Sequence, residues 1–359
     1  MQRFLVRSRN FDYPVVVGRG AWSEFRKFPR AKHSSIFILT ERPLWRQWGR
    51  EFLRASGLGS AKEIFVPSGE SSKSLRRAEE AALTLLKQGA DRRSLLIAFG
   101  GGVIGDLGGF VASTYMRGID YIQIPTTVVA QVDSSIGGKT AVNAGEMKNL
   151  IGTFAPPRLV LADPKVLSSL QPRAFRSGFY EVVKHAILSG PSLFALMERE
   201  TESLAPDGGE KLERLLIRAA RVKIDVVNHD EQESDLRRVL NLGHTFGHAL
   251  EEATGYERML HGEAVGWGLL CASRLGTLLD MLPASDAGRI DQLVRRVGPL
   301  PHIRDLVPSK ILRLLSRDKK TVGGRIHWVV PERIGKVRII SDVPAEVAAA
   351  ALRSVQQGL

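Results

Sequence analysis

The chain has 359 residues, 43% hydrophobic and 25% charged, which is the composition of an ordinary soluble globular protein. It is long enough for two domains. No apolar run approaches the roughly 18–20 residues of a membrane span. The net charge of +13 can indicate a nucleic-acid-binding protein, but the basic residues are scattered among acidic ones, so we expect a small anionic ligand and neither nucleic acid nor a membrane as partner. The single cysteine, Cys271, excludes an internal disulfide, and the N-terminus has no signal-peptide pattern, so we expect a cytoplasmic protein.

The first half of the sequence alternates strand-like and helix-like stretches. Short apolar, β-branched runs predict buried strands at residues 35–40, 63–67, 95–100, 121–125 and 158–163. Between the second and third of these, residues 72–90 have apolar side chains at helical spacing and end at a glycine stop signal. Strands that alternate with helices indicate a parallel sheet covered on both faces. We therefore expect residues 1–165 to form an α/β domain with a mainly parallel, Rossmann-like sheet.

The second half is different in character. From about residue 172 to 320 nearly every stretch has helical periodicity, and residues 324–340 are typical of a small hairpin. We expect residues 166–359 to form a mainly α-helical domain, with a small-molecule site in the cleft between the two domains.

A glycine-rich turn follows the third predicted strand, where Gly100, Gly102 and Gly105 fit the spacing G-x-G-x-x-G. Glycines at this spacing let a pyrophosphate approach the amides of a helix N-terminus. The acidic residue that usually follows about twenty residues later is missing. The turn alone therefore fits dinucleotide binding and simple packing equally well.

Residues 124–152 hold an unusual set of polar groups. Two threonines follow a predicted strand, and then come Asp133, a Gly-Gly-Lys run that ends at Lys139, and the pair Lys148 and Asn149. Lysines among hydroxyl and amide donors suit a phosphate or a carboxylate. The alternative is a solvated polar loop.

Residues 241–265 contain three of the chain's eight histidines, His244, His248 and His261. Upstream, Glu181 and Lys184 share one helix face at spacing i, i+3, which is either a surface ion pair or part of a site. Zinc prefers imidazole and carboxylate ligands, and catalytic zinc sites use three of them. Spacing alone leaves metal binding, substrate binding and a solvated helix face open for the histidines.

In chain order, the segments GGGVIGDLGGF, PTT, QVDSSIGGKTAVN, the Glu-x-x-Lys helix, NLGHTFGHA and HGEAV resemble the 3-dehydroquinate synthase family, within the wider sugar-phosphate cyclases. The resemblance extends over nearly the whole chain. It implies an NAD-binding N-terminal domain, a metal-binding helical C-terminal domain and a homodimer. It also implies conversion of the sugar phosphate 3-deoxy-D-arabino-heptulosonate 7-phosphate to 3-dehydroquinate and phosphate, in the shikimate pathway of aromatic amino-acid biosynthesis.

Position by position, the resemblance implies roles for single residues. The ligands of Zn2+ or Co2+ would be Glu181, His244 and His261, whereas His248 would face the substrate. The NAD-contacting positions would be Glu70, Lys73, Gly101, Gly102, Asp106, Thr126, Thr127, Asp133, Lys139, Lys148 and Ser169, with Asp133 near both NAD and substrate. The substrate positions would be Lys139, Lys148, Asn149, Lys184, Lys223, Arg237 and Asn241. Arg117 would reach the phosphate site of the neighbouring subunit, and Lys319 or Lys320 would close over the phosphate.

Several positions depart from the family pattern without removing a group that has an implied role: Met147, Ala155, Pro156, Ser169 and Tyr180. The nearest alternatives are a cyclase acting on sedoheptulose 7-phosphate or glucose 6-phosphate and a metal-dependent polyol dehydrogenase of related fold. A carboxylate-bearing substrate needs additional polar and cationic partners, and these favour the synthase: Lys223, Arg237, Asn241 and His248.

Overall fold

The computed structural model describes residues 1–145, 147–207, 209–233, 236–315 and 326–358. The chain divides into two compact units, one made of Met1–Leu170 with Ala205–Gln232 and the other of Gln171–Leu204 with Glu233–Leu359. The first division lies close to the boundary expected at residue 165. Residues 205–232, which the sequence pattern groups with the helices around them, make their contacts in the first unit.

Seven strands of the described chain form the sheet of the first unit, in the order β1-β2-β9-β6-β5-β3-β4. Their bounds are β1 Gln2–Val6, β2 Tyr13–Val17, β3 Ile36–Glu41, β4 Lys62–Val66, β5 Leu95–Gly100, β6 Asp120–Pro125 and β9 Val160–Ala162. Only the β1–β2 pair among them is antiparallel. The expected parallel sheet is confirmed, and the antiparallel edge pair is an addition that the sequence pattern did not predict.

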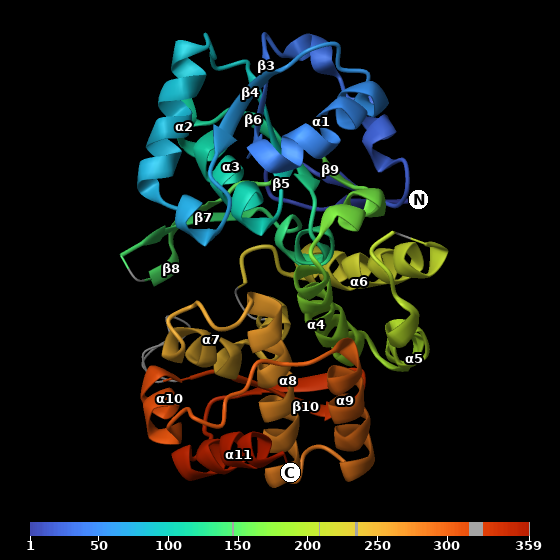
Figure 1. Ribbon diagram of the computed structural model, residues 1–359, viewed down its shortest axis with the longest axis vertical. Coiled ribbons are helices and arrows are strands. Elements are labelled where there is room, and N and C mark those ends of the chain that lie inside the picture. The colour runs from blue at the N-terminus through green and yellow to red at the C-terminus, as the bar shows by residue number, and fades with distance from the viewer. Residues whose placement is uncertain (146, 208, 234–235, 316–325, 359) are drawn as a thin grey trace. The chain divides into compact units, whose positions relative to one another are not determined.

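Helices cover both faces of this sheet (Figure 1). Leu96 and Ala98 of β5 belong to a core with α2 (Leu75–Lys87) and α3 (Gly102–Thr114). Phe99, on the opposite face, packs against Trp22 and against Phe52 of α1 (Arg42–Ser56), with ring centroids 5.7 and 5.1 Å apart. Because side chains alternate along a strand, this burial on both sides explains the continuous apolar run of β5.

Two further elements complete the first unit. The hairpin of β7 (Lys139–Ala144) and β8 (Met147–Phe154) packs on α3 through β7. Helix α6 (Glu210–His229) packs on β1 and on the turn Ala130–Ser134. The polar segment 124–152 is therefore structured around a hairpin and is not a simple solvated loop.

The second unit is mainly helical, as expected, with a small hairpin. Its helices are α4 Pro172–Ser189, α5 Pro191–Glu200, α7 His244–Ala253, α8 His261–Leu278, α9 Ala284–Val297, α10 Pro308–Leu315 and α11 Ala345–Gln357, and its hairpin is β10 Trp328–Arg333 with β11 Lys336–Ile340. Short 3-10 or π turns of the two units lie at Ala21–Lys27, Arg30–Lys32, Glu70–Ser72, Tyr115–Arg117, Ala130–Ser134, Pro164–Ser169, Thr201–Ser203 and Leu236–Asn241. Among the described residues, none of the helices combines the length and apolarity needed to span a membrane.

Helix α8 lies at the centre of the second unit and contacts α4, α7, α9 and α11. Two of its glycines allow very close approach. A Cβ on Gly262 would lie 1.8 Å from the carbonyl oxygen of Ser177 in α4, and one on Gly268 would lie 1.7 Å from that of Gly243, just before α7. Since only glycine fits at these two points, the first half of α8 is held close to α4 and to the start of α7.

Candidate active site

Three potential metal ligands from three helices of the second unit converge: Glu181 in α4, His244 at the start of α7 and His261 at the start of α8. Oε1 of Glu181 lies 3.4 Å from Nε2 of His244 and 3.3 Å from Nε2 of His261. Metal bonds of about 2.0–2.1 Å in a tetrahedron place ligand atoms roughly 3.3–3.4 Å apart. The two distances from Glu181 therefore fit a tetrahedral zinc site, as they also fit direct hydrogen bonds.

The carboxylate of this cluster is deeply buried, with a side chain 1% exposed. Burial opposes its ionisation, but the charge of Lys184 and the contacts with His244 and His261 hold the pKa of Glu181 well below its usual range. Nζ of Lys184, also 1% exposed, lies 2.6 Å from Oε2 of Glu181. Glu181 is thus an anion in a dry setting, which suits a metal ligand, and its pairing with Lys184 is not a surface ion pair.

Each ring of the two converging histidines is oriented through its other nitrogen. Nδ1 of His244 lies 3.2 Å from the carbonyl oxygen of Leu242, and Nδ1 of His261 lies 3.2 Å from Oε2 of Glu251. Burial lowers the pKa of His261, but the hydrogen bonds to Glu181 and Glu251 outweigh it and raise the pKa to about 10. Metal-ligating histidines usually have such a carboxylate or carbonyl partner on the second nitrogen.

Glu251 is a site residue that the sequence reasoning missed. It is 2% exposed and lies on α7, seven residues after His244, so the two side chains share a helix face two turns apart. Its partner is His261 on α8 and not His244 on its own helix, so helical spacing in the sequence did not identify it.

His248 lies close to the same cluster. Its ring centroid is 5.4 Å from that of His244 and 6.0 Å from that of His261. The set His248, Glu251 and His261 also brings one potential ligand atom from each side chain within 4.8 Å of the others. We favour Glu181, His244 and His261 as the metal set because Glu181 contacts Nε2 of both histidines at the spacing of a shared metal.

Further predicted substrate residues lie in the second unit near the start of α7. Arg237, in the turn Leu236–Asn241, is 1% exposed. Nδ2 of Asn241 donates a hydrogen bond of 2.9 Å to Oε1 of Glu233. Lys319 and Lys320 lie outside the described residues.

In the first unit, the predicted NAD positions gather where the parallel strands end. Gly100 of β5 pairs with Pro125 of β6, so the glycine turn and Thr126 with Thr127 follow neighbouring strands. A Cβ on Gly101 would lie 2.9 Å from Cγ2 of Thr127, so the backbone stays bare at the start of α3. A bare helix N-terminus at the carboxyl edge of a parallel sheet is where dinucleotide phosphates bind in such folds.

A charged group borders this turn. Nζ of Lys73 pairs with Oδ2 of Asp106 in α3, and their side chains are 7% and 18% exposed. Burial raises the pKa of Asp106 while the charge of Lys73 opposes the rise. Glu70 accepts a 2.8 Å hydrogen bond from Nδ2 of Asn143 in β7. Gly102, the first residue of α3, would place a Cβ 3.2 Å from Oγ of Ser134.

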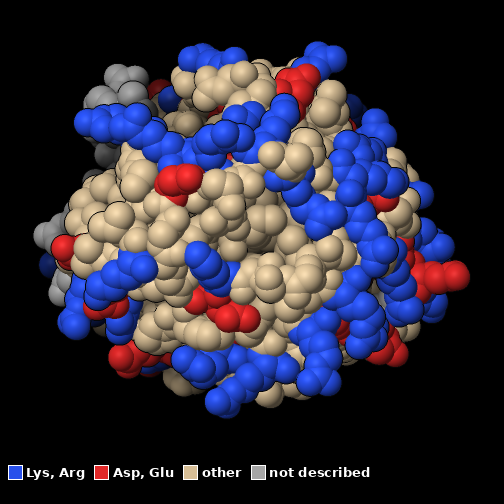
Figure 2. All heavy atoms as spheres, turned by 90° about the horizontal axis from the view of Figure 1, so that it is seen from above, with Lys and Arg blue, Asp and Glu red and all other residues tan. Residues whose placement is uncertain are grey.

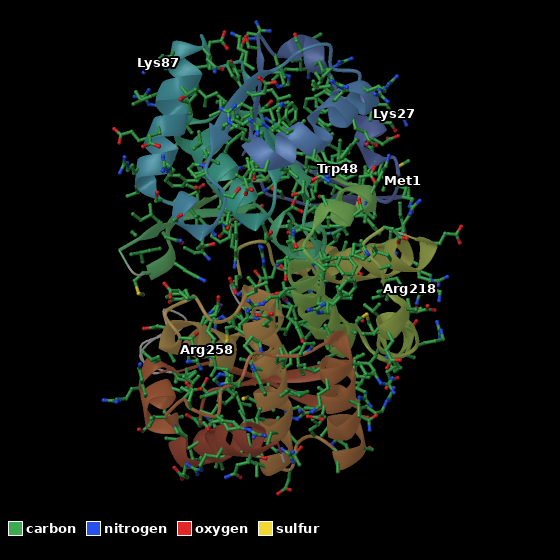
Figure 3. The ribbon with its side chains drawn as sticks, viewed as in Figure 1. Met1, Lys27, Trp48, Lys87, Arg218 and Arg258 are labelled. Atoms are coloured by element: carbon green, nitrogen blue, oxygen red, sulfur yellow. The ribbon has the colours of Figure 1, made fainter. Side chains whose placement is uncertain are left out.

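The remaining predicted residues of the first unit fall into three groups. Asp133 pairs with Nζ of Lys223 in α6. The hairpin carries Lys139 and Asn149, which are exposed, and Lys148, which is partly buried. Ser169 accepts a 2.9 Å hydrogen bond from Nε1 of Trp48, which Figure 3 labels.

Arg117 stands apart from these groups, on the turn after α3. It is exposed, and its backbone φ of 71° follows a φ of 49° at Met116. Two consecutive residues other than glycine in the left-handed region are uncommon, and such backbone conformations cluster at functional sites.

A hollow of about 360 Å3 lies at the opposite, amino edge of the sheet, at the end of the first unit where Figure 3 labels Lys87, the last residue of α2. Figure 2 looks onto this face and shows abundant Lys and Arg with few acidic side chains. Asp120 bridges two groups in the hollow, 2.6 Å from Nε of Arg158 and 3.0 Å from Nε2 of His33, and Arg93 donates to the Lys32 carbonyl. None of the predicted site residues lines this hollow. Its charged side chains pair with one another, which indicates a structural role for them.

An α/β unit with a dinucleotide-type glycine turn and a helical unit with a carboxylate–histidine cluster together define an enzyme of the class that combines a nucleotide cofactor with a metal ion. Comparison with known proteins identifies the family. Residues 63–177 match the 3-dehydroquinate synthase N-terminal family and residues 178–321 the 3-dehydroquinate synthase C-terminal family. The chain belongs to the 3-dehydroquinate synthase family, as its motifs indicated.

Individual relatives agree with this assignment. The 3-dehydroquinate synthase of Solibacter usitatus is 40% identical over 99% of both chains, and that of Koribacter versatilis is 42% identical over 99% of this chain and 98% of the relative. Among solved structures, 2-epi-5-epi-valiolone synthase from Streptomyces hygroscopicus subsp. jinggangensis 5008, with NAD+ and Zn2+ bound, is 27% identical with a TM-score of 0.88 over 98% of this chain and 99% of that one.

Proposed function

We propose that this chain converts 3-deoxy-D-arabino-heptulosonate 7-phosphate to 3-dehydroquinate and phosphate, with NAD bound to the first unit and Zn2+ or Co2+ to the second. Full-length relatives that carry this activity in their names support the reaction. The observation that supports the metal most directly is the spacing of 3.3–3.4 Å between Glu181 and the two histidines.

The donor set fits the metal. One buried carboxylate and two imidazoles, with three protein ligands in all, are the composition of a catalytic zinc site with an open position. Bound NAD supplies reversible hydride transfer, and the bound metal ion supplies polarisation of substrate hydroxyls. Glu181, His244 and His261 would hold the metal.

The chain's own residues then have to bind and orient a substrate with two anionic groups, a phosphate and a carboxylate. Cationic and amide side chains are proposed to hold its phosphate and carboxylate: Lys139, Lys148, Asn149, Lys184, Lys223, Arg237 and Asn241. His248, beside the metal cluster, would contact the substrate. Holding one molecule at several points lets successive steps proceed without release.

The NAD positions are proposed to be Glu70, Lys73, Gly101, Gly102, Asp106, Thr126, Thr127, Asp133, Lys139, Lys148 and Ser169. We also propose a cytoplasmic homodimer in which Arg117 serves the neighbouring subunit. The exposure of Arg117 supports such an outward role.

The experiment is phosphate release from the proposed substrate by chelator-stripped protein, with NAD below the protein concentration, with and without added Zn2+. We expect many turnovers per NAD, dependent on metal, without accumulating NADH. Absence of release with this substrate, but release from sedoheptulose 7-phosphate or glucose 6-phosphate, would make the chain a different cyclase. Net NADH formation from a simple polyol would make it a dehydrogenase.

A further inference from the structure

Asn143, in β7, connects two segments of the first unit that have different proposed roles. Its Nδ2 donates a 2.8 Å hydrogen bond to Oε1 of Glu70, and its Oδ1 accepts a 2.9 Å hydrogen bond from the backbone N–H of Asn149. Its own backbone N–H donates to the carbonyl oxygen of Lys73 at 2.8 Å. The Glu70 carboxylate can only accept a hydrogen bond and the Asn149 N–H can only donate one. The orientation of the Asn143 amide is therefore fixed, with Nδ2 toward Glu70 and Oδ1 toward Asn149.

The hairpin is irregular at this residue. Val142 pairs with Ile151, but Ala144 pairs with Met147, so the single residue Asn143 stands opposite residues 148–150 of β8. Such a bulge redirects side chains and is common beside active sites. Here it contains Lys148 and Asn149, two of the proposed substrate residues.

The bulge places Asn149 in a left-handed backbone conformation that a hydrogen bond from Asn143 stabilises. Asn149 has a φ of 54°, in the left-handed region that few residues other than glycine adopt, asparagine among them. The hydrogen bond from its N–H to Asn143 is one interaction that holds it there. On the other side, Glu70 and Lys73 belong to the proposed NAD-contacting group.

We propose that Asn143 is a positioning residue that holds the NAD-contacting turn at Glu70 and the substrate-contacting bulge at Lys148 and Asn149 in fixed relation. This inference rests on the proposed function. Asn143 acts through its neighbours, the donor end of its amide through Glu70 and the acceptor end through Asn149. The donor end therefore acts on a proposed NAD position, Glu70, and the acceptor end on a proposed substrate position, Asn149.

The two ends can be separated by substitution. N143A removes both hydrogen bonds, whereas N143D keeps an acceptor for the Asn149 N–H and places a second carboxylate against Glu70. Asn228 provides a matched control, because it accepts from the Arg7 N–H at 2.7 Å and donates to the Leu5 carbonyl at 3.2 Å, in the same unit. N228A therefore removes a similar pair of bonds away from the proposed site.

The measurements are the Kd for NAD by titration without substrate, the KM for the sugar phosphate, and the melting temperature. We expect N143A to raise both the NAD Kd and the KM at least fivefold, and N143D to raise the NAD Kd at least fivefold while the KM stays within twofold of wild type. N228A should leave the NAD Kd and the KM unchanged, while it changes the melting temperature about as much as N143A does.

Two outcomes overturn the inference: N143A with both constants within twofold of wild type, or N143D raising the KM as much as N143A does. The NAD titration requires no turnover. A wild-type protein that binds NAD but releases no phosphate would therefore contradict the proposed reaction, while the effect of N143A on NAD binding would still test the Asn143–Glu70 contact.

Discussion

Oε2 of Glu251 lies 3.2 Å from Nδ1 of His261, and the other ring nitrogen of His261 lies 3.3 Å from Glu181. The imidazole is thus held between two carboxylates, one for each nitrogen. Because the ring cannot rotate without losing both contacts, Glu251 fixes the direction in which Nε2 points. The ring orientation is thus set by the protein's own side chains, and metal binding would release the Nε2 proton that the raised pKa implies.

Removing this orienting carboxylate should weaken metal binding. Partners of this kind typically contribute about 10–100-fold to metal affinity, so we expect E251A to raise the Kd for Zn2+ by a factor in that range, measured by competition with a chelating dye. The exposed neighbour Glu252 offers the control E252A, which should match wild type. Equal affinities for the two variants would remove Glu251 from the site.

Substitution of single histidines should identify the metal set. His261 belongs to both possible sets, whereas His248 belongs only to the one without Glu181. We expect H261A to lose the metal after dialysis and H248A to retain one equivalent with reduced turnover, by metal analysis and phosphate release. Loss of metal in H248A would instead favour His248, Glu251 and His261 as ligands.

The close approach of α8 to Gly243 should make Gly268 intolerant of a side chain. A Cβ there would lie 1.7 Å from a backbone oxygen, and overpacking costs about 1–3 kcal/mol or more. We expect G268A to lower the free energy of unfolding by at least about 3 kcal/mol in denaturant titrations. In G288A, where nothing lies within 4 Å of the new Cβ, stability should be unchanged or slightly higher.

The ion network at the amino edge of the sheet should make stability depend on acid pH. The hydrogen bond from His33, with that from Arg158, lowers the pKa of Asp120 although burial opposes this. A lowered pKa means that the folded state favours the carboxylate, so its stabilisation is present above the unfolded value of about 4 and is lost as pH falls below it. We expect D120N to melt below wild type at pH 6, with a gap that narrows below about pH 4. A gap that is constant down to pH 2 would contradict this account.

Much of this protein is determined by local sequence pattern. Apolar runs such as residues 95–100 predict buried parallel strands because both faces must be apolar, and the strand and helix types were confirmed along most of the chain. The motifs around Gly100, Asp133, His244 and His261 were sufficient to indicate the family, since each keeps a fixed spacing in sequence.

Relations between distant segments were decided only by the tertiary structure. Periodicity tells which face of a helix is apolar but not which remote helix it meets, so the contact of Glu181 with His244 and His261 depends on packing at Gly262 and Gly268. For the same reason the pattern could not place residues 205–232 with the first unit or single out Glu251 and Asn143. Their roles arise from hydrogen bonds to residues that lie near them only after the chain has folded.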